Sequence, residues 1–225
     1  MNDTVNRMIQ QLDKETQGVG STATLHLVGA QHSKFLLAIK SRAEVLGLTT
    51  KFDYRSRYTE PVLVDLETAG DVPQYIKVKN DIDNISHSGL SCCAEAVFRI
   101  IEAYDMSEVN VALIGRKHAV KGLFDVLNTH NYTPLLCHSK TRGISKVTSA
   151  ADIVVNSATT ELEGVSLAGK LVIDISGTLR EVAEHTKVLC VARGDRPPVY
   201  IGARDVGRLN VSIVLNRFVR CSKIT

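Results

Sequence analysis

A short apolar run that ends in glycine and leads into an amphipathic stretch constrains the fold of this chain most. Val111-Ala-Leu-Ile114 forms the run, Gly115 follows at once, and apolar residues recur at helical spacing from Val120 to Leu127. Such a run is typical of a buried parallel strand, and the spacing after it predicts a helix. Strand, glycine turn and helix are the first unit of a dinucleotide-binding fold, in which the helix N-terminus offers free N–H groups to a phosphate. Because only Gly115 and Gly122 are present, an ordinary strand–helix turn is the alternative interpretation of this segment alone.

Helical and strand patterns alternate along the rest of the chain, which predicts an α/β fold with a mainly parallel sheet. The predicted helices cover residues 3–17, 33–46, 72–78, 91–104 and 206–219, and the predicted strands cover residues 24–28, 49–54, 61–66, 133–137, 150–155, 171–175 and 188–192. Only residues 55–60 separate two of these strands, whereas a parallel crossover usually takes about a dozen residues.

Composition and charge exclude several classes of function. The net charge of +3 is too small to indicate a nucleic acid or a membrane surface as partner. No apolar run approaches the roughly 20 residues that span a bilayer, and the polar N-terminal segment predicts no signal peptide. The five cysteines are odd in number and lack metal-ligand spacing, so we expect reduced thiols, no metal site and a cytoplasmic protein.

Cations and a hydroxyl follow two strands that a doubly wound fold would place side by side. Arg116 and Lys117 follow the first strand, and Ser139 and Lys140 follow the second. The carboxyl end of the second strand meets the adenosine ribose in such folds, and an acid there would bind the ribose hydroxyls of NAD. A hydroxyl with cations suits a 2′-phosphate instead, and therefore NADP. A solvated basic loop is the alternative, and spacing alone does not decide between the two.

Four short motifs in order link the chain to a known family. They are Ile114-Gly-Arg-Lys-His-Ala-Val120, Cys137-His-Ser-Lys-Thr141, Ala151-Asp-Ile-Val-Val155 and Ile173-Asp-Ile175. Through them the chain resembles the bifunctional methylenetetrahydrofolate dehydrogenase/methenyltetrahydrofolate cyclohydrolase family, which has V-x-G-R-S-x-x-V-G-x-P, C-H-S-x-T, A-D-I-x-x and I-D-x-G at these places. The resemblance runs from about residue 24 to 218 and is most specific between residues 111 and 178.

The resemblance implies two α/β domains that flank a cleft, the second a Rossmann-like NAD(P)-binding domain with a mainly parallel sheet. Residues 1–87 would form the folate-binding and catalytic domain, residues 88–205 the NADP-binding domain, and a C-terminal helix over 206–225 would pack back on the first. It also implies NADP as cofactor, a folate-type small molecule as substrate, and a homodimer.

The resemblance also assigns the site residues. Lys40 has the family lysine's spacing from Ser33, Asp65 replaces the glutamine that assists that lysine, and Asp83 matches the family's D-V-D-G; these would be the catalytic residues. The residues implied to bind NADP are Gly115, Arg116, Lys117, His118, Val120, His138, Ser139, Lys140, Ser157 and Ile175. The residues implied to contact the folate are Leu36, Asp83, Val206 and Gly207.

A lysine that polarises or protonates the folate centre needs a pKa lowered by burial or tuned by its neighbours. We expect Asp65 close to Lys40, where the carboxylate would favour the ammonium form and act against water activation. The alternative for Lys40 is a solvated helix lysine.

The departures from the family fall mainly on the folate side. Leu36 stands where the family has tyrosine, Lys121 replaces a glycine of the phosphate turn, and of a glycine-rich folate loop only scattered residues such as Gly207 survive. Three functions therefore stay open. The first is an NADP-dependent methylenetetrahydrofolate dehydrogenase, with or without cyclohydrolase activity. The second is a degenerate, non-catalytic homologue that acts as a nucleotide-binding or protein-interaction module. The third is an NADP enzyme for another substrate, in which Arg204 and Arg208 meet an anionic group.

Overall fold

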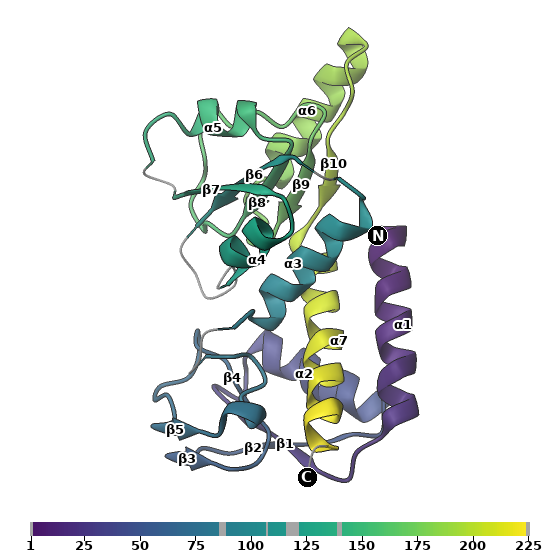
Figure 1. Cartoon of the computed structure of the whole chain (residues 1–225), viewed down its shortest axis with the longest axis vertical. Helices are drawn as coiled ribbons and strands as arrows, with labels where there is room; N and C mark the ends of the chain where they lie inside the picture. Colours follow the sequence, from purple (N-terminus) through teal and green to yellow (C-terminus); the bar gives the residue numbers. More distant parts are fainter. Residues whose placement is uncertain (1, 86–88, 107, 116–121, 139–140, 224–225) are drawn as a thin grey trace. The chain divides into compact units, whose positions relative to one another are not determined.

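Helices alternate with parallel strands in the computed structural model, which describes residues 2–85, 89–106, 108–115, 122–138 and 141–223 (Figure 1). Contacts divide the chain into two compact units. The first unit comprises Cys93–Gly207 with the residues up to Val5, and the second comprises Asn6–Cys92 with the residues from Arg208 on. The parallel α/β architecture confirms the predicted fold class. Among the described helices, none combines the length and the apolar character needed to cross a membrane.

The first unit holds a five-stranded parallel sheet in the order β10–β9–β8–β6–β7. Its strands are β6 (Asn110–Ile114), β7 (Thr133–Cys137), β8 (Ile153–Asn156), β9 (Leu171–Asp174) and β10 (Val199–Ile201). The helices of this part of the chain are α3 (Cys92–Ala103), α4 (Leu123–Thr129), α5 (Ile144–Ala150) and α6 (Arg180–Arg193). The chain moves from β6 to β7 on one side and then to β8 on the other, so the strand order reverses at β6. In open α/β sheets, ligands bind outside the carboxyl ends of the strands at such a reversal.

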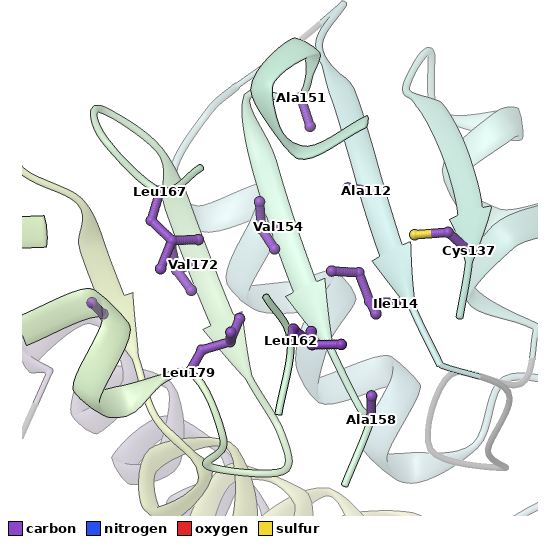
Figure 2. Close-up of a cluster of buried hydrophobic side chains, with 11 residues drawn as sticks. Ala112, Ile114, Cys137, Ala151, Val154, Ala158, Leu162, Leu167, Val172 and Leu179 are labelled. Atoms are coloured by element: carbon purple, nitrogen blue, oxygen red, sulfur yellow. The ribbon is translucent and has the colours of Figure 1, made fainter. Parts of the chain in front are cut away.

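Apolar side chains fill both faces of this sheet, as its continuous apolar strands predict. Every residue of β8 and β9 is buried. On one face, Ile114, Val154 and Val172 from three adjacent strands pack with Leu167 and Leu179 from the connecting segments (Figure 2). This packing fixes the strands, and the strands in turn position the turns that follow them.

The second unit holds a three-stranded parallel sheet in the order β2–β1–β4 and a two-stranded parallel ribbon of β3 and β5. Its elements are α1 (Asp3–Val19), β1 (Thr24–Val28), α2 (Lys34–Val45), β2 (Thr49–Phe52), β3 (Arg57–Tyr58), β4 (Val62–Val64), β5 (Tyr75–Ile76), a 3₁₀ helix η1 (Val78–Asn80) and most of α7 (Ala203–Ser222). The short connection between β2 and β4 crosses β1 through β3, without a helix. Helix α7 is tied to this unit by Ser212, which donates to Asp13 over 3.0 Å, and by Arg217, whose Nη1 donates to the Ile82 carbonyl over 3.0 Å.

The strand predicted over residues 188–192 is wrong, because these residues form the end of helix α6 (Figure 1). Their apolar side chains are not core: Val188 and Val191 are 66% and 70% exposed, and only Cys190 is buried. The helix ends at Gly194, whose positive φ caps it, and the fifth strand is β10. An apolar run of this length cannot be distinguished from a strand by periodicity alone.

The short helix predicted over residues 72–78 is also wrong. Tyr75–Ile76 forms strand β5 and Val78–Asn80 forms η1. The strand pairs with Arg57–Tyr58, far away in the sequence, so local periodicity could not reveal it.

The environment of the α6 end predicts how substitutions there behave. Val191→Lys should change the free energy of unfolding by less than about 0.5 kcal/mol, because the side chain already faces solvent. Ile173→Ala, at a fully buried position of β9, should lower it by about 2–5 kcal/mol. Urea unfolding followed by circular dichroism measures both. If Val191→Lys lowered the free energy of unfolding by about 2–5 kcal/mol, as expected for Ile173→Ala, the helical assignment would be contradicted.

Candidate functional site

Four of the residues predicted to bind NADP lie at one edge of the five-stranded sheet. Gly115 follows β6, His138 follows β7, Ser157 follows β8 and Ile175 follows β9. The register places them at one level, since Ile114 pairs with both Cys137 and Asn156, and Asn156 pairs with Asp174. The other predicted cofactor residues lie outside the described residues: Arg116, Lys117, His118, Val120, Ser139 and Lys140.

Gly115 occupies a position that no other residue fits. Its φ of +130° is one that L-residues rarely adopt, and a Cβ added there would lie 2.0 Å from Ser157 Oγ. The Gly115 N–H donates to the Cys137 carbonyl over 2.8 Å, and the Ser157 N–H donates to the Ile114 carbonyl over 2.8 Å. The bare backbone of this turn therefore passes directly against the turn after β8, a close approach that only glycine allows.

Gly115→Ala should therefore be more damaging than a glycine substitution at an open position with positive φ. We expect a loss of at least about 3 kcal/mol in the free energy of unfolding, because backbone strain adds to overpacking against Ser157. Gly194→Ala is the matched control, with φ of +76° and nothing within 4 Å of the added Cβ, and should cost about 1–2 kcal/mol. Equal losses for the two variants, measured by denaturant unfolding, would contradict the close approach.

A fully buried carboxylate, Asp174, binds together the turns beside this edge. Its Oδ2 accepts from the Leu179 N–H over 2.8 Å and from the Tyr200 hydroxyl over 2.9 Å. Its Oδ1 accepts from the Gly177 N–H over 3.1 Å and from Asn156 Nδ2 over 3.0 Å. These bonds join the ends of β8 and β9, the start of α6 and strand β10. The Ile173-Asp-Ile175 motif is visible in the sequence, but the sequence gives no indication of this role for its aspartate.

Two neighbours complete this polar cluster. Asn156 is itself fully buried, and its Nδ2 lies 2.9 Å from both Ser176 Oγ and Thr178 Oγ1. Burial, together with the hydrogen bond to and the charge of Asp174, raises the pKa of Tyr200 above its ordinary value. The tyrosine hydroxyl therefore keeps its proton and keeps donating to the carboxylate.

Asp174→Asn tests this cluster with little change of volume. An amide in place of one oxygen would set an N–H₂ group against donors that need an acceptor, so we expect a loss of about 3 kcal/mol in the free energy of unfolding. Asp195→Asn, an exposed aspartate of the same unit, should change it by less than about 0.5 kcal/mol. Urea unfolding of both variants measures the difference, and a neutral Asp174→Asn would refute the role given to this carboxylate.

In the second unit, Asp65 organises the carboxyl end of β4. It is buried, and its Oδ2 accepts from the hydroxyls of Ser33 and Thr68, each over 2.6 Å. Ser33 is the N-cap of α2 and accepts from the Leu36 N–H over 3.2 Å. Such short distances are typical of charge-assisted bonds from hydroxyls to a carboxylate. Asp65 thus holds the start of the helix that carries Leu36 and Lys40.

Lys40 lies on the exposed side of α2. Its side chain is 47% exposed, and its Nζ lies 3.9 Å from Glu44 one turn later. Within the described chain no hydrogen bond or ion pair joins Lys40 to Asp65, whose partners are the hydroxyls. No direct contact therefore supports the expectation that Asp65 favours the ammonium form of Lys40. Leu36, one turn before Lys40, is fully buried against Gly29.

The remaining predicted substrate residues are divided between the two units. Asp83, in the second unit, is half-buried and its Oδ1 accepts from the Cys92 N–H at the start of α3 over 2.6 Å. Val206 and Gly207 belong to the first turns of α7 within the first unit, and Val206 is buried. Arg204 and Arg208, the alternative anion contacts, are exposed.

The side chains of the described residues form no cluster of three or more His, Cys, Asp and Glu suited to a metal ion. All five cysteines are free thiols, and burial raises the pKa of Cys137, at the carboxyl end of β7.

Comparison with known proteins agrees with the motifs. Residues 91–187 match the family model of the tetrahydrofolate dehydrogenase/cyclohydrolase NAD(P)-binding domain. The bifunctional protein FolD of Clostridium botulinum is 27% identical over 130 residues, which cover 55% of this chain and 46% of the relative. That of Thermosipho africanus is 33% identical over 152 residues, which cover 59% of this chain and 51% of the relative. The chain thus spans about half the length of the curated relatives it matches.

Solved structures extend the likeness of fold over nearly the whole chain. The methylenetetrahydrofolate dehydrogenase-cyclohydrolase of Trypanosoma brucei, complexed with NADP cofactor and inhibitor, superposes with a TM-score of 0.74 at 19% identity, over 98% of this chain and 95% of that one. The bifunctional enzyme of Thermoplasma acidophilum gives 0.70 at 17% identity, over 100% of this chain and 98% of that one. The chain therefore resembles the bifunctional methylenetetrahydrofolate dehydrogenase/cyclohydrolase family, as its motifs predicted, and the match to that family's NAD(P)-binding domain covers residues 91–187.

Proposed function

We propose that this chain is an NADP-dependent oxidoreductase of one-carbon metabolism that acts as a methylenetetrahydrofolate dehydrogenase. One observation carries the proposal: Gly115, His138, Ser157 and Ile175 end four adjacent parallel strands at one level, within the segment that matches an NAD(P)-binding domain. This is the edge at which doubly wound sheets bind nucleotides.

The shape of that edge suits a dinucleotide. Gly115 itself carries no side chain, and the turns after β8 and β9 are held by the buried carboxylate of Asp174. Gly115, Ser157 and Ile175 would hold the cofactor chiefly through their backbones, and Arg116, Lys117, Ser139 and Lys140 would bind the 2′-phosphate. NADP supplies the hydride acceptor when bound, and the chain contributes alignment and electrostatics.

On the folate side, we propose that Lys40 contacts the substrate and that Asp65 is a positioning residue. One oxygen of Asp65 accepts from the hydroxyls of both Ser33 and Thr68, so we infer that Asp65 acts by fixing Ser33 at the start of α2. Residues 1–87 would form the folate domain with the helix over 206–225, and residues 88–205 the NADP domain. Leu36, Asp83, Val206 and Gly207 would line the folate site.

The surroundings of Lys40 suit hydride transfer better than cyclohydrolase activity. Hydrolysis needs a lysine tuned to orient water, and the Lys40 side chain is 47% exposed beside Glu44. Hydride transfer requires alignment of two bound ligands and makes no such demand on Lys40. The resemblance also supports a homodimer, and the free thiols support a cytoplasmic location.

Nucleotide titration and a turnover assay test the proposal separately. NADP should bind at least about tenfold more tightly than NAD, because two or more positive groups meet the 2′-phosphate. With methylenetetrahydrofolate, absorbance should rise at the band of the reduced nicotinamide. Lys40→Met should lower this rate by about 100-fold and leave NADP affinity unchanged. Lys34→Met, an exposed lysine at the start of the same helix, is the control and should change neither.

The outcomes of these two assays distinguish the proposed functions. NADP binding without turnover would favour the non-catalytic module over the enzyme. An equal affinity for NAD would refute the roles of Arg116, Lys117 and Ser139. A Lys40→Met variant with the full rate would remove that lysine from the reaction.

A further inference from the structure

A pocket of about 980 Å³ opens at the amino end of the three-stranded sheet. Its lining comes from the segment between α1 and β1, from Thr24 and His26 of β1, from Thr59–Pro61 before β4, and from the C-terminal end of α7. Figure 1 shows the loop after α1 and the end of α7 at the same end of this unit. Asp65, Gly29 and the start of α2 follow the carboxyl ends of the same strands. Among the described residues that are assigned above to NADP or folate, none lines this pocket.

Positive charge dominates this pocket. Lys77, Lys79 and Lys223 line it, against Glu60 as the carboxylate among the lining residues. That carboxylate is engaged elsewhere, because Glu60 Oε1 lies 3.1 Å from Arg55 Nη1. A volume of about 980 Å³ is ample for a small organic molecule, since such sites span roughly 300–1,000 Å³. An anion is the charge class that fits.

His26 gives the pocket a second kind of polar group. Only 5% of the residue is exposed, and its Nδ1 lies 2.8 Å from Asp53 Oδ1. Because a carboxylate only accepts, we assign the ring proton to Nδ1, which leaves Nε2 as an acceptor in the neutral ring. Within the part of the chain that the structure describes, Nε2 has no hydrogen-bond partner, and His26 lines the pocket. An acceptor on a residue that lines the pocket suits a ligand hydroxyl.

Asp53 holds the His26 imidazole in this orientation. Burial alone would raise the pKa of Asp53, but the hydrogen bond from His26, with the nearby cations Arg55 and Lys51, lowers it below its ordinary value. The aspartate therefore stays ionised and keeps accepting from Nδ1. The ring of Tyr58 lies 5.6 Å from that of His26, and its hydroxyl donates to the Asp53 carbonyl over 2.9 Å.

We propose that this pocket binds a hydroxylated organic phosphate, a small molecule that carries a phosphate group together with free hydroxyls. The three lysines would meet the phosphate as point charges, whereas a planar carboxylate would be better matched by the fork of an arginine. Nε2 of His26 and the side chains of Thr22, Thr24 and Thr59 would meet the hydroxyls. The proposal does not depend on the dehydrogenase activity.

Calorimetric titration of the full chain tests this with three probes: ribose 5-phosphate, inorganic phosphate and ribose. Ribose 5-phosphate should bind at least about tenfold more tightly than either of the others, because it alone presents both groups. The double variant Lys77→Gln/Lys223→Gln should weaken its binding at least about tenfold. Lys14→Gln/Lys187→Gln removes the same charge from exposed sites outside the pocket and should leave binding unchanged. His26→Gln should weaken ribose 5-phosphate more than inorganic phosphate.

The lysine variants keep the test decisive, since they lie at the surface and should fold even if His26→Gln does not. No binding of ribose 5-phosphate, or equal binding to the two double variants, would overturn the proposal. So would binding no tighter than that of inorganic phosphate. A fall in NADP affinity by the same factor in Lys77→Gln/Lys223→Gln would show that the probe shares the nucleotide site, and would overturn it as well.

Discussion

A buried carboxylate that must find donors is the constraint on which the nucleotide edge of this protein depends. Asp174 is fully buried, and a charge in that position is costly unless its lone pairs are used. The donors come from the turn after β9, the start of α6, the end of β8 and Tyr200 of β10. Satisfying one side chain therefore fixes four separate segments, and the turns that face the ligand edge are preorganised.

The second unit uses the same device at the carboxyl end of its own sheet. Asp65 follows β4 as Asp174 ends β9, and it too is buried and accepts from hydroxyls, one of its own loop and one at the start of α2. The consequence differs. Asp65 fixes the start of a helix through the N-cap Ser33, whereas Asp174 fixes the end of β8, the turn after β9, the start of α6 and Tyr200 of β10. The position at which the resemblance implies a glutamine is thus occupied by a carboxylate that holds the Ser33 and Thr68 hydroxyls.

The two ends of the three-stranded sheet also differ in character. At the carboxyl end the polar groups satisfy one another, as Asp65 does with Ser33 and Thr68. At the amino end the pocket beside His26 gathers lysines and hydroxyls around an acceptor that has no partner among the described residues. A satisfied network stabilises the fold, whereas cations and hydroxyls that line an open pocket are suited to a ligand.

The sequence by itself determined the alternating architecture and the turn at Gly115, because strands buried on both faces read as continuous apolar runs and a glycine directly after one marks a close backbone approach. It also placed Ser157 and Ile175 near that turn through short motifs. It misassigned residues 188–192, since an apolar run is the same whether its side chains reach a core or face solvent, and only the packing shows Val191 exposed. It gave no hint of the roles of Asp174, Asn156 and Tyr200, nor of the pocket at His26. Those depend on segments distant along the chain meeting in space, which only the tertiary structure decides.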